Sequence, residues 1–328
     1  MSDQWSDIAP STHPGVDSVR RVEIQYPLDF RRGKDFHGRY IFVLEGAADA
    51  ATLPAPPKLG GIDVSTIFDG SVCRLTLTLL DPGYFEIFHV LCHDLLSSTS
   101  SLPRGDNSRG LYIVLKRLIR WQELLRRRRD DVLTKQQIIG LMGELLFLRD
   151  MVFPAIGDSA ISAWRGPYGD EQDFVHAQWI FEIKTQLSTS DQRIYISSES
   201  QLDTTSGNIA LCYQTLGPSS LDDLNSRSLN DIVDEIKGLL GAQNSSAILQ
   251  FELALIELNY RKRPEYDELR WVLASRRAYV VGNGFPRITP SNIPLGIEKV
   301  IYHIRLEACQ PFEVDLETLM ERAFGRRN

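Results

Sequence analysis

The sequence has few cysteines, and the four that it contains (Cys73, Cys92, Cys212 and Cys309) are scattered, without a Cys-x-x-Cys pair. This distribution argues against a zinc ribbon or a disulfide framework, and it indicates reduced thiols in a cytoplasm. No apolar run approaches the roughly 18–20 residues of a membrane helix. The first residues, MSDQWSD, lack the basic region and apolar core of a signal peptide. We therefore expect a cytoplasmic protein with no membrane partner.

Positive charge is also scarce, because 36 Lys and Arg residues stand against 43 Asp and Glu residues and give a net charge of −7. Non-specific DNA affinity comes largely from cations that neutralise phosphates. A DNA-binding role would thus need local positive charge or a partner subunit. A basic stretch, Lys116, Arg117, Arg120 and 126–129, is either a phosphate-contacting face or a solvated helix end. The sequence contains no P-loop, Ser-centred triad, repeat or coiled coil.

One segment, 166–185 (GPYGDEQDFVHAQWIFEIKT), suggests a definite chemistry. Its aromatic and β-branched residues around 179–183 favour a strand, which places Glu182 and Lys184 on one face. If 173–176 and 179–184 form a hairpin with a two-residue loop at 177–178, Asp173 lies directly opposite Glu182. Opposed residues have Cβ atoms roughly 4.5–5.5 Å apart. Two carboxylates that close would repel unless a cation lies between them.

The same register separates the two faces of the hairpin. Asp173, Glu182 and Lys184 share one face with two apolar residues, and the opposite face is apolar and suited to packing against a helix. Mg²⁺ binds oxygen ligands, and one or two carboxylates plus a substrate phosphate can hold it. Lys184 would position or deprotonate a water molecule or stabilise the phosphate in the transition state. The segment therefore predicts a metal-dependent phosphodiesterase site.

A plain alternative exists for this segment, namely a surface hairpin with a Glu and a Lys on its solvated face. A lone Glu-x-Lys carries little information, as Glu235-Ile236-Lys237 illustrates. That triplet falls in 229–240, where the apolar residues have helical spacing, so its two charges should diverge and be solvated.

A second acidic candidate, Glu144, lies in an apolar run upstream. Thr134 and Gln137 form a capping box, so a helix should begin there. Gly140 and Gly143 would allow a close approach of another backbone. A buried Glu is unusual unless it is paired or metal-bound. Glu144 is thus either part of the site or an edge residue paired with a Lys or Arg.

Several separate segments together resemble a known family. They are GLMGELLFL around Glu144, WRGP at 164–167, Asp173-Phe174, FEIKT at 181–185, and ISSESQL at 196–202, with further matches at 88–95, 121–125, 279–288 and 295–302. This succession resembles DUF4420, a bacterial family of unknown function placed with the PD-(D/E)XK proteins. The resemblance extends from about residue 20 to the end of the chain.

The resemblance implies an α/β fold with a restriction-endonuclease-like core, a mixed sheet flanked by helices, and β-rich N- and C-terminal extensions. In such cores Asp173 and Glu182 would bind Mg²⁺ or Mn²⁺, Glu144 would assist the metal or its water, and Lys184 would be the catalytic cation. The family is also similar to proteins encoded near restriction and phage-defence genes. Analogy with this class further points to a homodimer, with one protomer for each DNA strand.

One feature departs from the common core of helix, three strands, helix and strand. The third and fourth strands would be 193–197 and 208–213, and about ten residues are few for a crossover to a parallel strand. Either a very short helix lies at about 200–203, or the topology is modified. Gln201 falls there, and it either contacts the site or is a surface residue in a turn.

Three regions are expected: a β-rich N-terminal region with a helix (1–108), the nuclease-like core (109–246) and a C-terminal α+β region (247–328). The predicted strands are 22–26, 39–44, 64–68, 72–79, 269–281 and 299–306, the predicted helices are 84–96, 111–128, 221–240 and 312–324, and 247–258 is ambiguous. The predicted function is Mg²⁺-dependent hydrolysis of DNA in a restriction or phage-defence system, by an endonuclease rather than an exonuclease. The alternative is a non-catalytic subunit that uses the same fold to bind nucleic acid or a partner of a defence complex.

Overall fold

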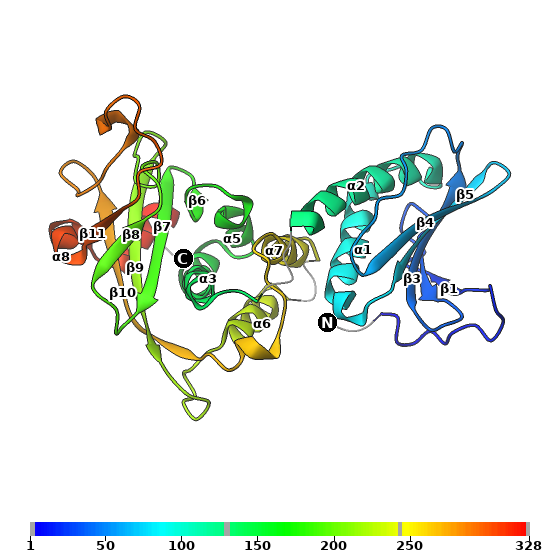
Figure 1. Ribbon diagram of the computed structural model, residues 1–328, viewed down its shortest axis with the longest axis horizontal. Coiled ribbons are helices and arrows are strands. Elements are labelled where there is room, and N and C mark those ends of the chain that lie inside the picture. The colour runs from blue at the N-terminus through cyan, green and yellow to red at the C-terminus, as the bar shows by residue number, and fades with distance from the viewer. Residues whose placement is uncertain (1–3, 128–131, 242–244, 326–328) are drawn as a thin grey trace. The chain divides into compact units, whose positions relative to one another are not determined.

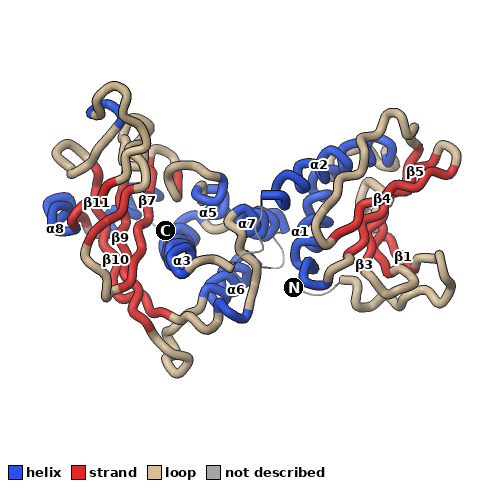
Figure 2. Tube along the Cα trace, viewed as in Figure 1, coloured by secondary structure: helices blue, strands red, loops and turns tan. Residues whose placement is uncertain are grey.

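The computed structural model describes residues 4–127, 132–241 and 245–325, and the chain divides into two compact units, Met1–Asp130 and Asp131–Asn328 (Figure 1). Each unit contains its own sheet with helices packed against it (Figure 2). None of the helices in the described part of the chain combines the length and the apolar character that crossing a bilayer requires.

The N-terminal unit is built on an antiparallel five-stranded sheet with the order β1-β2-β3-β5-β4. Its strands are β1 (Ser18–Arg21), β2 (Arg31–Lys34), β3 (Tyr40–Ala47), β4 (Ile62–Asp69) and β5 (Val72–Leu79). Two helices, α1 (Phe85–Thr99) and α2 (Asn107–Arg127), follow the sheet, and α2 packs against β3 and α1. The alternating pattern in 72–79 correctly predicted β5.

The predicted strand at 22–26 was wrong. This segment forms turns, and β1 and β2 lie on either side of it. The apolar residues that enter the core here are Leu28 and Phe30, whereas Ile24 is 77% exposed. The valine and isoleucine make the composition of this segment strand-like, but the segment has no buried face.

Helix α2 is tied to α1 by a buried carboxylate. Asp94 of α1 accepts hydrogen bonds from Arg117 Nε at 2.6 Å, from Arg117 Nη2 at 2.7 Å and from the indole of Trp121 at 2.7 Å. The expected boundary at 108 comes before α2, but these contacts place α2 in the N-terminal unit. Arg117 is thereby committed to Asp94, and 128–129 of the basic stretch lie outside the described residues.

The C-terminal unit contains a mixed sheet with the order β12-β10-β9-β7-β6, in which β7 and β9 are parallel and the other pairs antiparallel. Its strands are β6 (Phe174–His176), β7 (Trp179–Leu187), β9 (Asn208–Pro218), β10 (Trp271–Val281) and β12 (Glu313–Val314). A separate two-stranded ribbon is formed by β8 (Arg193–Ile196) and β11 (Tyr302–Arg305). The mixed sheet with flanking helices is the fold class expected from the sequence.

Helices cover one face of this sheet and the ribbon covers the other (Figure 1). The helices on the first face are α3 (Lys135–Phe147), α4 (Phe153–Ile156), α5 (Ser159–Ala163), α6 (Leu229–Leu240), α7 (Ser245–Glu257) and α9 (Leu316–Phe324), and a π-helical turn, Leu148–Val152, continues α3. The short α8 (Leu306–Cys309) follows β11 and packs on the ribbon side. Phe174, Phe181 and Ile183 belong to the helix-side core. Ile180 and Leu211 pack toward the ribbon. The predicted separation of the hairpin faces is confirmed.

Of the two alternatives expected from the sequence, a very short helix or a modified topology, the structure has the modified topology. β8 leaves the main sheet and pairs with β11, so β9 lies directly beside β7. The region around 200–203 forms turns and contains no helix. The parallel connection is therefore long enough, because it runs from the end of β7 through β8 to β9.

The remaining differences concern the C-terminal half. The ambiguous segment at 247–258 is helix α7, and the helix expected over 221–240 begins only at Leu229, behind a Ser228 capping box. The region expected as separate from residue 247 onward does not stand apart, since β10 pairs with β9 along most of its length. The physical reason is that β10 is itself a strand of the central sheet, so this region shares the sheet and its core.

Candidate active site

The hairpin that carries the acidic residues has the predicted register. Phe174 faces Phe181, Val175 faces Ile180, and His176 faces Trp179. The loop residue Ala177 takes a φ of 50°, a left-handed conformation that a non-glycine residue rarely adopts. Ala-Gln is a poor sequence for a two-residue hairpin loop, and the chain closes the turn through the positive φ of Ala177.

Asp173 lies immediately before β6, where the backbone pairing between β6 and β7 ends. Its Oδ2 atom accepts the backbone N–H of Ile183 at 2.7 Å. The backbone carbonyl of Asp173 accepts from the N–H groups of Arg165 and Gly166 at 2.7 and 3.2 Å. The side chain of Asp173 thus takes the place of the next backbone acceptor along the strand. Hydrogen bonds hold both its carboxylate and its backbone carbonyl.

Glu182, Lys184 and Gln201 form a closed triangle of polar contacts. Lys184 Nζ lies 2.8 Å from Glu182 Oε1, and Gln201 Nε2 donates to the same oxygen at 2.9 Å. Gln201 Oε1 accepts from Lys184 Nζ at 3.2 Å and from the N–H of Ser197 at 3.0 Å. The turn after β8 therefore brings Gln201 into the site, and Gln201 is 9% exposed.

The second oxygen of Glu182 has no such partner. Glu182 is 1% exposed, and its Oε2 atom is buried without a hydrogen bond. An unsatisfied buried carboxylate oxygen costs free energy, because water no longer solvates it and no donor replaces the water. The atom is therefore a ready ligand for a cation.

Glu144 projects toward this hairpin from α3. The helix begins at Thr134 with the predicted capping box, and it packs so closely on β7 that a Cβ on Gly143 would lie 1.7 Å from Thr185 Oγ1. Gly140 has nothing within 4 Å of such a position, so only Gly143 serves the close approach. The half-buried Glu144 accepts a hydrogen bond from Trp164 Nε1 at 2.7 Å, and no Lys or Arg is its ion-pair partner among the ion pairs of the described residues.

Glu144 and Asp173 converge at Gly166. A Cβ at Gly166 would lie 3.0 Å from Glu144 Oε2 and 3.2 Å from Asp173 Oδ1. Glycine at this position thus keeps free the space next to two carboxylate oxygens. Neither Gly166 nor Trp164 was singled out as a functional residue from the sequence, although both lie in the WRGP segment that contributed to the family resemblance.

The charges of the site are strongly perturbed. Burial raises the pKa of Glu182 to about 8, and the nearby Asp173 adds to the rise while Lys184 opposes it. Burial raises the pKa of Asp173 to about 6, against the Ile183 hydrogen bond and Lys184. Burial and then Asp173 raise the pKa of Glu144 well above its usual range. These directions are typical of clustered carboxylates that lack a compensating cation.

Lys184 is affected in the opposite sense. Burial lowers its pKa, but Glu182 first, and then Asp173 and Glu144, raise it by more, so the net shift is upward. Lys184 is therefore protonated at neutral pH. This state suits the positioning or charge-stabilising role considered for Lys184 better than the role of a base.

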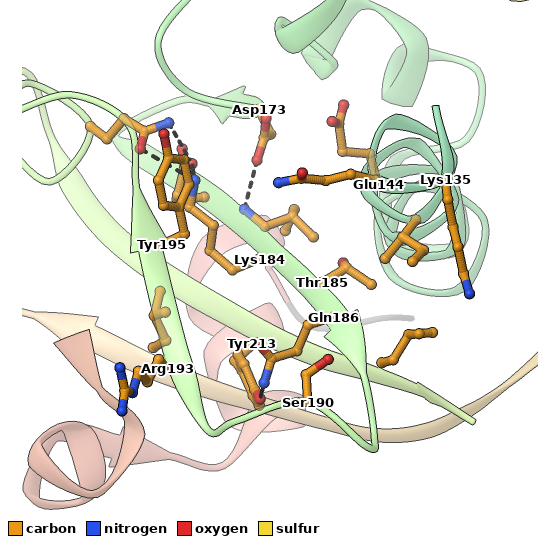
Figure 3. Close-up of a pocket in the computed structure, with 18 residues that line it drawn as sticks. Lys135, Glu144, Asp173, Lys184, Thr185, Gln186, Ser190, Arg193, Tyr195 and Tyr213 are labelled. Carbon is orange, nitrogen blue, oxygen red and sulfur yellow. Dashed lines mark hydrogen bonds and ion pairs between the residues drawn. The ribbon is translucent and has the colours of Figure 1, made fainter. Parts of the chain in front are cut away.

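These side chains line one cavity of about 610 Å³ (Figure 3). In this view Lys135 and Glu144 lie on α3 on one side of β7, and Arg193 and Tyr195 of β8 lie on the other. The lining includes all five residues selected from the sequence, Glu144, Asp173, Glu182, Lys184 and Gln201. It also includes residues that the sequence did not single out: Lys135, Gln136, Ile139, Thr185, Gln186, Leu187, Ser190, Arg193, Ile194, Tyr195 and Tyr213.

The donor set fits a hard divalent cation. Oε2 of Glu182, which has no hydrogen bond, and Oδ1 of Asp173, which faces Gly166, are both carboxylate oxygens. Mg²⁺ and Mn²⁺ prefer this type of ligand. Among the described residues, no group of three or more His, Cys, Asp or Glu side chains is arranged to hold a metal. Two carboxylates with substrate phosphate and water would complete an Mg²⁺ shell.

A second polar network holds α3 against the sheet below the site. Gln214 of β9 is fully buried, donates to the carbonyl of Gly143 at 2.9 Å and accepts from Arg276 Nε at 2.6 Å. Arg276 also pairs with Asp150 of the π-helical turn at 3.1 Å. π-Helical turns often occur near functional sites. Here the turn supplies the anion that compensates a nearly buried arginine.

The second Glu-x-Lys triplet lies on α6, as its spacing predicted. Its charges are not simply solvated, however. Glu235 contacts Arg149 and Arg227, each at 2.5 Å, and Lys237 lies 3.4 Å from Glu252. The residues form structural ion pairs away from the cavity.

Comparison with known proteins identified one family. A family model described as "Putative PD-(D/E)XK family member, (DUF4420)" matches residues 1–307. Searches of curated proteins and of solved structures gave no match.

Proposed function

Because the chain belongs to the DUF4420 family, and because its cavity joins three carboxylates to a lysine, we propose that the protein is a Mg²⁺- or Mn²⁺-dependent nuclease that hydrolyses phosphodiester bonds of DNA. The observation that carries the proposal is the buried, unpartnered Oε2 of Glu182 beside Asp173. A fold alone does not establish an activity, and this arrangement of side chains is what supports one.

Each side chain has a role that follows from its contacts. Asp173 and Glu182 hold the cation, and Glu144, fixed by Trp164, assists the cation or the attacking water from α3. Lys184 stabilises the negative charge that develops on the phosphate, since the nearby carboxylates keep it protonated. Gln201 keeps Lys184 and Glu182 in one geometry, and from the wall of the cavity it would contact the substrate. A bound divalent cation would activate water and offset charge on the phosphate.

The biological setting is part of the proposal. Similarity to proteins encoded near restriction and phage-defence genes supports a role in bacterial defence, with DNA as the target and other defence subunits as partners. Endonucleolytic action by a homodimer, one protomer for each strand, follows from analogy with this class. The net charge of −7 suits an arrangement in which a partner supplies part of the DNA affinity.

The test is a cleavage assay with Mn²⁺ on supercoiled plasmid, linear duplex and single-stranded DNA. Wild type should cut at least one of these, whereas Lys184→Ala should be inactive although it still binds the ion. Arg322→Gln, an exposed change on α9, serves as the control that should retain activity. If wild type binds neither Mg²⁺ nor Mn²⁺ and cleaves no substrate with any candidate partner present, the nuclease proposal is wrong.

A further inference from the structure

The β8–β11 ribbon presents an exposed face whose composition the fold itself does not require. The antiparallel register places Arg193 opposite Arg305 and Tyr195 opposite His303. The inward residues Ile194, Ile196 and Ile304 are at most 4% exposed and fill the core beneath the ribbon. Packing therefore depends on the inner face, and the outer face is available for another purpose.

The two arginines on this face are directly opposed like charges, an arrangement that destabilises a strand pair. Their side chains are 63% and 80% exposed. Arg193 lies 3.9 Å from Asp191, and Arg305 lies 3.5 Å from Glu307, and both acids are themselves largely exposed. Ion pairs of this kind contribute little. The pair is consequently available to an external anion.

An aromatic pair lies beside the arginines. The rings of Tyr195 and His303 have centroids 5.3 Å apart in an edge-to-face arrangement, and Tyr195 is 42% exposed. The outer face thus alternates a cationic pair with an aromatic pair along the ribbon. Cations with interleaved aromatic rings are the composition of surfaces that bind nucleic-acid strands through phosphates and bases together.

This face adjoins the candidate active site. Arg193 and Tyr195 line the same cavity as Asp173, Glu182 and Lys184, and they lie across β7 from Glu144 (Figure 3). Gln201, which binds Glu182 and Lys184, follows β8 by a single turn. A strand that lies along the ribbon would therefore lead into the cavity.

We propose that this outer face of the ribbon, Arg193, Tyr195, His303 and Arg305, binds a single-stranded stretch of the nucleic-acid substrate next to the cleavage site. The arginines contact phosphates, and the two rings stack on unpaired bases. The inference rests on the proposed function and narrows its substrate to DNA with an unpaired stretch at the cleavage site, in place of fully paired duplex. Exposed rings favour unpaired nucleotides, because a duplex buries the faces of its bases in its own stack and leaves mainly phosphates and groove edges to contact.

The test measures binding in EDTA, so that cleavage does not interfere. A fluorescent single-stranded DNA longer than the ~4–16 nucleotides that a strand-binding module covers is compared with the duplex of the same sequence. Wild type should bind the single strand at least about tenfold more tightly. The double variant Tyr195→Ala/His303→Ala should lose about tenfold or more of that affinity, with little change for the duplex. Tyr195→Phe, which keeps the ring, should retain it.

The arginines are tested by the salt dependence. In Arg193→Gln/Arg305→Gln, the slope of log affinity against log salt should become shallower by about 0.7 for each phosphate that the variant no longer neutralises. Matched controls are Tyr112→Ala, which removes a ring that is 40% exposed in the N-terminal unit, and Arg322→Gln on α9. Both should bind like wild type. Thermal unfolding of every variant shows whether a weaker affinity merely reflects impaired folding.

Equal affinity for single strand and duplex, or ribbon variants that bind like wild type, would overturn the inference. If wild type cleaves DNA with Mn²⁺ and the ribbon variants cleave it equally well, the proposed function is retained and the inference about the ribbon is rejected. Ribbon-dependent binding of single strands without any cleavage would support the ribbon and remove the proposed nuclease activity. Absence of both binding and cleavage would reject both.

Discussion

Lys184 holds one oxygen of Glu182 at 2.8 Å and leaves the other oxygen of the same carboxylate buried without a partner. The lysine offsets part of the negative charge in the cluster, but three carboxylates exceed what one lysine compensates. Burial first, and then the nearby Asp173, raise the pKa of Glu182 to about 8 in spite of the ion pair. A divalent cation bound at Glu182 Oε2 would offset the remaining negative charge of the site.

Binding of Mn²⁺ should depend on both Asp173 and Glu182 and should strengthen as pH rises. The ligands must lose their protons first, and with pKa values of about 6 and about 8 they do so mainly between those two values. Calorimetry should show weak binding at pH 5.5 and strong binding at pH 8.5. Asp173→Asn and Glu182→Gln should each bind at least about tenfold more weakly.

Lys184→Ala is the matched comparison for that experiment, because the lysine offers no ligand to a cation. It should retain Mn²⁺ binding. A pH-independent affinity, or an affinity unchanged in Glu182→Gln, would show that the ion binds elsewhere.

Without a divalent cation, the protein should be less stable at high pH than at low pH. An unfolded glutamate titrates at about 4.3, whereas Glu182 keeps its proton in the fold up to about 8. Between these values the unfolded state binds fewer protons than the folded state, so the free energy of unfolding falls as pH rises. Thermal unfolding in EDTA from pH 5 to 9 measures the trend.

Glu182→Gln should flatten this pH dependence in part, since glutamine cannot ionise and only Asp173 and Glu144 remain. Glu317→Gln, an exposed change on α9, should follow the wild-type curve. If Glu182→Gln loses stability with pH as steeply as wild type, Glu182 is not the source of the effect.

Gly143 and Gly140, one helical turn apart on α3, should respond in opposite directions to alanine. A methyl group on Gly143 would lie 1.7 Å from Thr185 Oγ1 and 2.6 Å from Thr185 Cβ, so no rotation of Thr185 relieves the overlap. Gly143→Ala should therefore lower the free energy of unfolding by about 1–3 kcal/mol or more. Chemical denaturation measures it.

Gly140→Ala is the internal control, because no atom lies within 4 Å of the added methyl group. Alanine is a better helix former than glycine, so this variant should gain about 0.5–1 kcal/mol. Equal destabilisation by both substitutions would mean that α3 does not pack on β7 at Gly143.

Gly166→Ala should weaken Mn²⁺ binding while the protein remains folded. The added methyl group would lie at 3.0 Å from Glu144 Oε2 and 3.2 Å from Asp173 Oδ1, so both carboxylates must shift. Calorimetry should show a loss of affinity of a few-fold to about tenfold, with a smaller change in thermal stability than in Gly143→Ala. Unchanged affinity would place the cation away from Glu144 and Asp173.

The hairpin was predictable because its information is local. A strand has a period of two, so the identity of the residues at 173–184 determines both which side chains share a face and which carboxylates oppose each other. The capping box at Thr134 is local in the same way, and it placed the start of α3. The strand at 22–26 failed because composition alone does not reveal whether a segment has a buried partner.

The sequence by itself therefore determined the hairpin, the start of α3 and the family to which the chain belongs, since each depends on residues close together or on a succession of short segments. Only the tertiary structure decided the rest. It brought Glu144 to Gly166, turned Gln201 toward Glu182, removed β8 from the main sheet, and placed Tyr195 and Arg193 beside the cavity. These relationships join residues far apart in the chain, and their distances depend on how helix, sheet and ribbon pack together.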